Sequence, residues 1–202
     1  MKKVIIIGAS GHAKVIADIV IKSGDKLVGF LDDNIQLPNK VIGYPYLGVI
    51  SNYPKYADDC CFVIGIGNNS IRKRIAESMN VTWYTALHPS AQIAIDTAVG
   101  GGTVVMANAT INPSATIGKH CIVNTASVIE HDNTIGDYVH ISPNATLCGN
   151  VSVGDSVHIG AGVTVKNNVS VCRDVTVGAG GVVVKNINES GIYIGVPVTK
   201  VI

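Results

Sequence analysis

The chain has 202 residues, of which 47% are hydrophobic and 14% charged, and its formal net charge is +1. A net charge this close to zero does not indicate nucleic acid or an anionic membrane as a binding partner. Five cysteines are scattered without CxxC spacing, which indicates free thiols in a reducing compartment and not a disulfide framework or a zinc site. Because no apolar run approaches the ~18 residues of a membrane span, we expect a cytoplasmic protein.

The first domain, 1–85, is predicted to be a Rossmann-like α/β domain that opens with a strand, a glycine turn and a helix. Lys3–Ile7 is a β-branched apolar run typical of a buried strand, and apolar residues recur at helical spacing over residues 13–22. A helix N-terminus at such a turn suits a phosphate group. The full GxGxxG fingerprint is absent, so a tight turn without a ligand remains the alternative. The candidate phosphate-binding residues of this turn are Ser10, Gly11 and His12.

A second strand is expected at Lys26–Leu31, and it ends in two carboxylates, Asp32 and Asp33. Carboxylates at this position of a nucleotide-binding fold often meet a ribose hydroxyl. A solvated turn explains the same residues, because Asp and Asn favour turns. Residues 34–50 are rich in Pro and Gly and predict a loop.

A third strand is expected at Cys60–Ile64, followed by a glycine turn that contains Gly67 and by a helix over residues 70–79. A last strand is expected at Val81–Tyr84, before a hinge at Leu87-His-Pro-Ser. The three loops that follow the strands should meet at one edge of a parallel sheet, where ligands bind in open α/β folds. Together they predict a nucleotide site.

The second domain, residues 86–202, is organised by a short repeat. An aliphatic residue recurs at every sixth position from Ile93 to Val183, sixteen times in succession. A fixed short period over this length predicts a solenoid in which each unit is a short strand and a turn. A single unit cannot bury its apolar face, so the units must stack.

The hexads, such as ATIGKH and VSVGDS, resemble those of the hexapeptide-repeat acyltransferases. The resemblance implies a left-handed parallel β-helix of triangular section, an exception to the right-handed crossover rule. In that family three hexads form one coil, so equivalent positions of successive coils stack and the sixteen hexads would form about five coils. No long insertion interrupts the series, and Gly195-Val-Pro resembles the segment that closes these enzymes.

A more specific resemblance covers the whole chain. The motifs GASGH, FLDD, IGNN and HPSA, followed by an EH[DE] motif in the repeats, are similar to those of the sialic-acid O-acetyltransferase and PglD-like sugar-acetyltransferase family. Its best known members transfer acetyl from acetyl-CoA to the 4-amino group of a UDP-4-amino-4,6-dideoxy-N-acetylhexosamine. They are homotrimers with active sites between neighbouring β-helices, and we expect no metal in the present chain. The resemblance implies the same activity and assembly here.

The EH[DE] motif stands here as Glu130-His131-Asp132, an imidazole flanked by carboxylates that can orient it and make it more basic. Taken alone, these residues would more often form a solvated charged turn. By resemblance His131 is the general base. We assign the carboxylate that raises its basicity to Asp132 at the corner of the coil, with Glu130 in reserve.

Two further histidines follow at informative spacings. His140 lies half a coil after His131, so the two can converge only if a neighbouring subunit supplies one of them. By resemblance His140 lies by the acetyl-CoA thioester. His158 follows His140 by one full coil, or three hexads, and should stack on it. A γ-carbonic-anhydrase-like metal site is the disfavoured alternative, because the expected close His pair is missing.

The resemblance also implies the remaining contacts. Small residues in the groove would admit the pantetheine arm of acetyl-CoA at Gly149, Ala161 and Ala179, although tight corners favour small residues in any case. The nucleotide sugar would contact Ser10, Gly11, His12, Asp32, Asp33, Gly67 and Asn124, the last of which could instead cap a corner. Cys121 and Cys148 carry no sign of activation as nucleophiles.

The sequence therefore predicts an acetyl-CoA-dependent N-acetyltransferase that acts on a nucleotide-linked, preferably UDP-linked, 4-amino sugar by direct transfer. Alternatives are O-acetylation of a sialic acid or polysaccharide sugar, and N-acetylation of a dTDP- or GDP-linked amino sugar. A trimeric nucleotide-binding scaffold without catalysis is the non-enzyme alternative. The partners expected are the nucleotide sugar, acetyl-CoA and two further copies of the chain.

Overall fold

The computed structural model describes residues 1–201, so Ile202, the last residue of the predicted second domain, lies outside them. The N-terminal part contains a parallel three-stranded sheet in the order β2-β1-β5. Its strands are β1 (Lys3–Ile7), β2 (Lys26–Leu31) and β5 (Cys61–Ile64). The helices are α1 (Gly11–Lys22) and α2 (Asn69–Ser78). These strands and helices are all present close to their predicted bounds.

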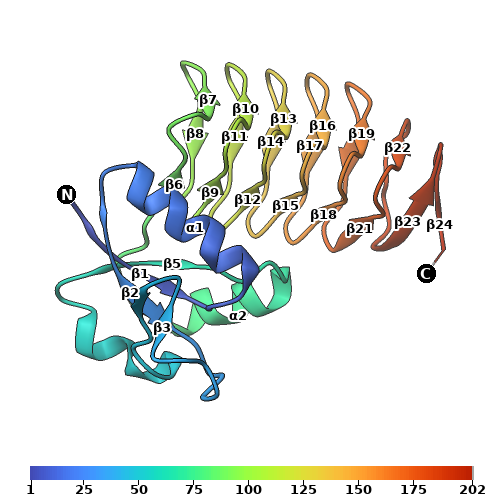
Figure 1. The fold of residues 1–202 in the computed structure, drawn as a ribbon. Helices are drawn as coiled ribbons and strands as arrows, with labels where there is room; N and C mark the ends of the chain where they lie inside the picture. Colours follow the sequence, from blue (N-terminus) through green and yellow to red (C-terminus); the bar gives the residue numbers. More distant parts are fainter. Residues whose placement is uncertain (202) are drawn as a thin grey trace.

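The two faces of this sheet pack against different helices, as alternation along β1 requires. Val4 and Ile6 pack with the buried face of α1, whereas Ile5 and Ile7 pack with the buried face of α2. The α1 cluster also takes in Val104 from the repeats, so the N-terminal part shares an apolar core with the β-helix. α1 runs along that junction in Figure 1.

The segment between β2 and β5 is more structured than a loop. It contains the short antiparallel pair β3 (Lys40–Val41) and β4 (Tyr44–Pro45), and a 3₁₀ helix, η1 (Ile50–Tyr56). The strand predicted at Val81–Tyr84 is wrong as an element: only one isolated bridge, Phe62 to Trp83, forms there. Because the chain then turns into the β-helix, a longer ladder does not develop.

The repeats form a left-handed parallel β-helix whose three faces are three sheets (Figure 1). The first face contains β7 (Gln92–Ile93), β10 (Thr110–Ile111), β13 (Val128–Ile129), β16 (Thr146–Leu147), β19 (Thr164–Val165) and β22 (Val182–Val183). The second contains β8 (Ala98–Val99), β11 (Thr116–Ile117), β14 (Thr134–Ile135), β17 (Ser152–Val153) and β20 (Ser170–Val171). The third contains β6 (Ala86–Leu87), β9 (Val104–Val105), β12 (Ile122–Val123), β15 (His140–Ile141), β18 (His158–Ile159), β21 (Val175–Val177), β23 (Gly191–Gly195) and β24 (Val198–Lys200).

Each coil consists of three hexads, as the repeat spacing predicts. Ile111 pairs with Ile129, and His140 with His158, in parallel register. The repeated aliphatic residues point inward and are buried from Val105 onward. The solenoid makes about six turns, one more than expected, because β6 and β23 extend it at either end.

The corners of the β-helix share one backbone conformation. The third residue after the inward aliphatic has a positive φ at every corner from Asp96 to Gly180, with values between 52° and 73°. Asn, Asp and Gly tolerate this left-handed region best, which is why they recur there in the sequence. A side chain at such a corner is turned sharply relative to its neighbours, and two functional features described below depend on this geometry.

Candidate active site

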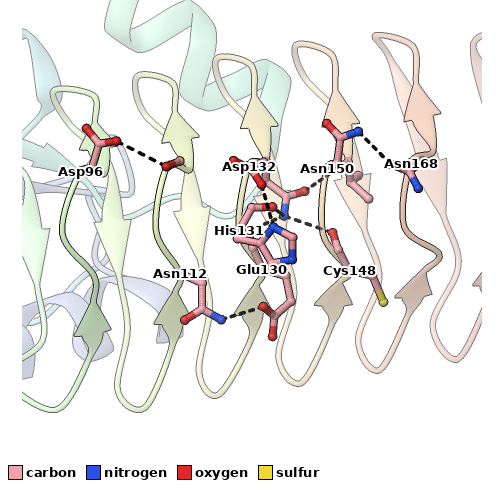
Figure 2. A network of polar contacts seen from close by, with 11 residues as sticks. Asp96, Asn112, Glu130, His131, Asp132, Cys148, Asn150 and Asn168 are labelled. Atoms are coloured by element: carbon pink, nitrogen blue, oxygen red, sulfur yellow. Dashed lines mark hydrogen bonds and ion pairs between the residues drawn. The ribbon is translucent and has the colours of Figure 1, made fainter.

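An exposed imidazole stands at the corner after β13. The Nδ1 atom of His131 lies 2.7 Å from Oδ2 of Asp132, and both side chains are more than half exposed. Asp132 occupies the left-handed corner position, with φ of 60°, and its carboxylate turns back onto the ring (Figure 2). Because an ionised carboxylate only accepts, Nδ1 of the neutral ring carries the proton. The Nε2 lone pair is then available to take a proton from a nucleophile.

Gly149, on the next coil, provides the room for this ring. A Cβ atom at position 149 would lie 2.6 Å from Cε1 and 2.7 Å from Nε2 of His131. The structure thus places Gly149, predicted as a contact of acetyl-CoA, directly against the candidate base. No side chain larger than hydrogen fits there without displacing the imidazole.

A buried amide holds the turn that carries His131. Asn133 is 1% exposed. Its Nδ2 atom donates to the carbonyl oxygens of Glu130 and, at 3.1 Å, of Cys148. Its Oδ1 atom accepts from the backbone N–H of Val151 at 3.0 Å. Asn133 therefore ties the His131 turn to the turn of the next coil, on which the imidazole lies.

Glu130, the reserve carboxylate, faces a different way. Its Oε2 atom accepts from Nδ2 of Asn112, one coil earlier, at 2.8 Å. In Figure 2 this pair lies on the strand side of the corner, away from the contact between His131 and Asp132. Of the two acids, Asp132 is the one in contact with the imidazole.

A second cluster of histidines lies on the third face. The rings of His140 and His158 stack with centroids 4.8 Å apart and planes 1° from parallel, as their spacing of one coil predicts. Asn124 belongs to this cluster: its Nδ2 lies 3.0 Å from Nε2 of His140. Its Oδ1 accepts from the backbone N–H of Thr125, which fixes the orientation of the amide. Nε2 of His140 is therefore an acceptor, and the proton is on Nδ1.

Burial keeps His140 neutral. Desolvation, followed by the neighbouring charges on His158 and Arg72, lowers the pKa of His140 to about 3. The backbone of Gly67 hydrogen-bonds the ring and opposes this shift. The neutral imidazole, with its lone pair already occupied, has little capacity to act as a base. Its predicted contact with the thioester stays a prediction.

The candidate residues for acetyl-CoA lie at two different corners of the prism. Gly149 is at the corner after the first face, beside His131. Ala161 and Ala179 follow β18 and β21 at the corner after the third face, where both are exposed. Backbone pairing from Gly180 to Ala161 connects these two turns. One chain does not bring the three predicted positions together, and their predicted role in binding is untested.

The predicted nucleotide loops do meet at the carboxyl edge of the N-terminal sheet. Oδ2 of Asp32 accepts from the N–H of Ala9 at 2.8 Å, which ties the second loop to the first glycine turn. Oδ1 of Asp33 accepts from the N–H of Ile50 at 2.9 Å. Asp33 lines a cleft of about 730 Å³ with Tyr53, Ile66, Ile71 and Arg74. An aromatic and aliphatic lining beside a carboxylate suits a heterocyclic base.

Ser10 and Gly11 begin α1, and His12 is in its first turn. The Nε2 atom of His12 is buried without a hydrogen-bond partner in the described chain. Burial, and then the charge of Arg72, lower its pKa to about 4. An unpaired polar atom of this kind is consistent with a ligand contact at this turn.

A larger cleft, of about 880 Å³, separates α2 from the third face of the β-helix. Its walls include Gly67, Asn69 and Lys73 on one side, and His140, His158 and Ser156 on the other. The cleft therefore joins a predicted nucleotide contact, Gly67, to a predicted acetyl-CoA contact, His140. His131 is not part of this wall in its own chain.

Several polar residues of this region were not predicted from the sequence. Asn133 and Arg72 are buried, Asn69 reaches the β-helix, and Ser142 lies 2.9 Å from Nε2 of His158. One of them could have been noticed in the sequence: Asn133 is an amide at a position where most hexads carry a small apolar residue.

Among residues 1–201, no group of three His, Cys, Asp or Glu side chains is arranged to hold a metal. No helix within these residues is long and apolar enough to cross a membrane.

Two family models match the chain in the order of its two parts. The PglD N-terminal domain matches residues 3–79, and the bacterial transferase hexapeptide repeat matches residues 134–167. The acetyltransferase domain of PglB from Neisseria gonorrhoeae, solved with acetyl coenzyme A, superposes with a TM-score of 0.93 and 30% identity, covering 99% of both chains. The chain belongs to the PglD-like sugar acetyltransferases.

Two further members of this family carry more specific names. PerB from Caulobacter crescentus, solved with CoA and GDP-perosamine, is 34% identical with a TM-score of 0.92, covering 99% of this chain and 97% of that one. UDP-N-acetylbacillosamine N-acetyltransferase of Bacillus subtilis (strain 168) is 39% identical over 115 residues. That match spans 53% of this chain and about half, 52%, of the relative.

Proposed function

We propose that the chain transfers acetyl from acetyl-CoA to the amino group of a nucleotide-linked amino sugar, with His131 as the general base. The observation that carries the proposal is the pairing of His131 with Asp132 on an exposed corner. It leaves one ring nitrogen free in a family whose solved members hold acetyl-CoA, or CoA with GDP-perosamine. The other histidines of the β-helix are buried or half-buried, and the pKa values of His120, His140 and His158 are lowered.

The proposed chemistry needs no covalent enzyme intermediate. The amine nitrogen attacks the thioester carbonyl carbon, and Nε2 of His131 takes the proton that the nitrogen loses. The carbon–sulfur bond then breaks, an amide remains on the sugar, and CoA leaves as the thiol after receiving that proton. Asp132 holds the imidazole in the tautomer that this step requires and stabilises the imidazolium.

We propose a uridine nucleotide as the carrier of the sugar. Asp33 keeps Oδ2 free of hydrogen bonds within residues 1–201, whereas both oxygens of Asp32 accept from backbone N–H groups. One free carboxylate oxygen suits the single ring N–H of uracil better than the paired donors of guanine. The similarity to the Bacillus enzyme also favours UDP, while PerB makes a GDP-linked amino sugar the second candidate.

We further propose that the working site lies between copies of the chain, in a homotrimer. His131 lies at the corner between the first and second faces, and the cleft beside His140 opens on the third face. A neighbouring copy that presents its His131 corner to this cleft would bring together base, acetyl donor and nucleotide sugar. Closed symmetric assemblies form such composite sites readily.

The test is an activity screen with a paired variant. Purified protein is incubated with acetyl-CoA and UDP-, dTDP- or GDP-linked 4-amino sugars, and products are detected by the mass increase of one acetyl group. We expect transfer to the UDP-linked amine and loss of turnover in His131→Ala, with binding of the nucleotide sugar largely retained. His88→Ala, at a histidine that does not line the cleft, is the control. Full activity of His131→Ala would refute the mechanism, and transfer to a sugar hydroxyl instead would refute the substrate assignment.

A further inference from the structure

Arg72, in the first turns of α2, is 1% exposed and is the largest fully buried side chain among the described residues. All five of its N–H donors are used. Nε donates to the carbonyl of His120 at 2.7 Å, and Nη1 donates to the carbonyls of Ile66 and Gly67 at 3.2 and 3.0 Å. Nη2 donates to Oδ1 of Asn69 at 2.7 Å and to the carbonyl of Tyr138 at 2.9 Å.

These acceptors belong to two different parts of the molecule. Ile66 and Gly67 form the glycine turn of the N-terminal domain, and Gly67 lines the cleft beside His140. His120 and Tyr138 occupy equivalent corner positions in two successive coils of the β-helix. One planar guanidinium therefore joins the turn to the solenoid through four backbone carbonyls.

The β-helix acceptors form a row. His120, Tyr138 and Ser156 recur once per coil and share the left-handed corner conformation, with φ of 52°, 59° and 60°. Asn69 extends the attachment to the third member of the row. Its Nδ2 atom donates to the carbonyls of Ser156, at 3.0 Å, and Val157, at 3.1 Å. The start of α2 is thus attached to three consecutive coils.

The chemistry of Arg72 is specific to this task. No carboxylate within residues 1–201 forms an ion pair with it, and burial lowers its pKa to about 10. A buried charge without an ionic partner is destabilising. If packing were the only requirement, an apolar residue at this position would make the fold more stable. A lysine offers three donors from a single point, whereas arginine offers five in a rigid plane. Only the arginine fork can reach both sides of this junction at once.

We propose that Arg72, assisted by Asn69, is a positioning residue that fixes the Gly65–Asn69 turn over His140 and so sets the distance between the nucleotide sugar and the acetyl donor. This inference rests on the proposed function for its kinetic consequence, but not for its structural one. Arg72 touches neither substrate, because its side chain is enclosed. It acts by holding the two walls of the 880 Å³ cleft in register.

A natural fluorescent probe, Trp83, lies at the junction between α2 and the β-helix. Trp83, the single tryptophan of the chain, contacts the ring of His120 edge-on, with centroids 4.6 Å apart. His120 in turn supplies the carbonyl that Arg72 binds through Nε. Movement of α2 away from the corner row should therefore change the fluorescence of Trp83, and it should expose the amides of the turn to exchange with solvent.

The experiment compares Arg72→Lys with Arg173→Lys, the same substitution at a side chain that is 77% exposed and pairs with Asp174. Hydrogen exchange is followed by mass spectrometry over residues 65–72, together with Trp83 fluorescence. We expect Arg72→Lys to raise exchange in this segment at least tenfold while the β-helix core stays protected. With a UDP-linked 4-amino sugar and acetyl-CoA, we expect kcat to fall at least tenfold and both KM values to stay within threefold. Arg173→Lys should change neither measurement.

Unchanged exchange in Arg72→Lys would overturn the proposal, as would faster exchange with an unchanged kcat. If Arg72→Lys does not fold, Asn69→Ala replaces it. This variant releases the third coil and removes one of the five acceptors of Arg72, but it leaves the guanidinium bound to four backbone carbonyls. Faster exchange over residues 67–72 is again expected, and unchanged exchange would again overturn the proposal. Absence of acetyl transfer by the unchanged chain would refute the proposed function alone, since the exchange comparison needs no substrate.

Discussion

Gly149→Ala should separate catalysis from stability. The added Cβ would lie 2.6 Å from Cε1 of His131, whereas carbon atoms in contact are ordinarily about 3.5 Å apart or more. The imidazole must therefore retreat by roughly 1 Å. Because its side chain is 60% exposed, it can do so by swinging toward solvent without disturbing the core. A displacement of about 1 Å from a reacting group costs about 100-fold in rate, or about 2.7 kcal/mol of transition-state stabilisation.

The stability of the same variant should not fall. Gly149 does not have the positive φ that alanine would find strained. Replacing such a glycine by alanine stabilises a protein by about 0.4–1 kcal/mol, through the reduced entropy of the unfolded chain. We therefore expect an unchanged or slightly higher Tm together with a kcat lowered about 100-fold.

The assay is steady-state release of CoA thiol, with Tm measured on the same samples. Gly101→Ala is the matched control: it occupies the same position of its hexad, and its added Cβ would meet no atom within 4 Å. A rise in the KM for acetyl-CoA with kcat unchanged would mean that Gly149 serves only the pantetheine arm. That result, or full activity of Gly149→Ala, would refute the steric argument.

Three further predictions concern the same region. Asp132→Asn should lower kcat at least tenfold with little change in Tm, since the amide can no longer hold the required tautomer; a kcat within twofold would contradict this. Asn133→Ala should destabilise the chain by about 2 kcal/mol in urea denaturation, because it strands buried backbone groups in two turns. Burial and the nearby Arg72 charge lower the pKa of His12 and His120 to about 4. The pKa of histidine in the unfolded chain is about 6.5, so the unfolded chain binds more protons than the folded chain between pH 6.5 and 4. The free energy of unfolding must therefore fall as the pH drops through that window, by up to about 1.4 kcal/mol per pH unit for each such histidine. His120→Phe, measured by urea denaturation from pH 7 to 4.5, should reduce that slope, and an unchanged slope would contradict the assignment.

Much of the fold could be read from local pattern. The hexad spacing determines which side chains face the core, and three such units per coil bring equivalent positions of successive coils into register. The stacking of His140 on His158 follows from this alone. The strands β1 and β2 were likewise predictable, because short β-branched runs bounded by glycine and aspartate typically form strands.

The site was only partly predictable. The pairing of His131 with Asp132 depends on adjacent residues at a corner, so sequence reasoning could reach it. The contact between Asn124 and His140 was not predicted, although the coil spacing places Asn124 directly after the strand that pairs with the His140 strand. The strand expected at Val81–Tyr84 failed because the path of the chain into the β-helix, and not β-propensity, ends the ladder there.

The sequence by itself determined the solenoid and its register, because a periodic pattern specifies which side chains point inward and which stack. The candidate base came from the family resemblance of the EH[DE] motif and not from the period. Only the tertiary structure decided how the two domains meet. Arg72 and Asn69 bind backbone carbonyls, and every residue has one of these regardless of its side chain. No pattern of residue types marks the row of His120, Tyr138 and Ser156 as a docking surface. It becomes one because the shared left-handed corners present their carbonyls in line to α2.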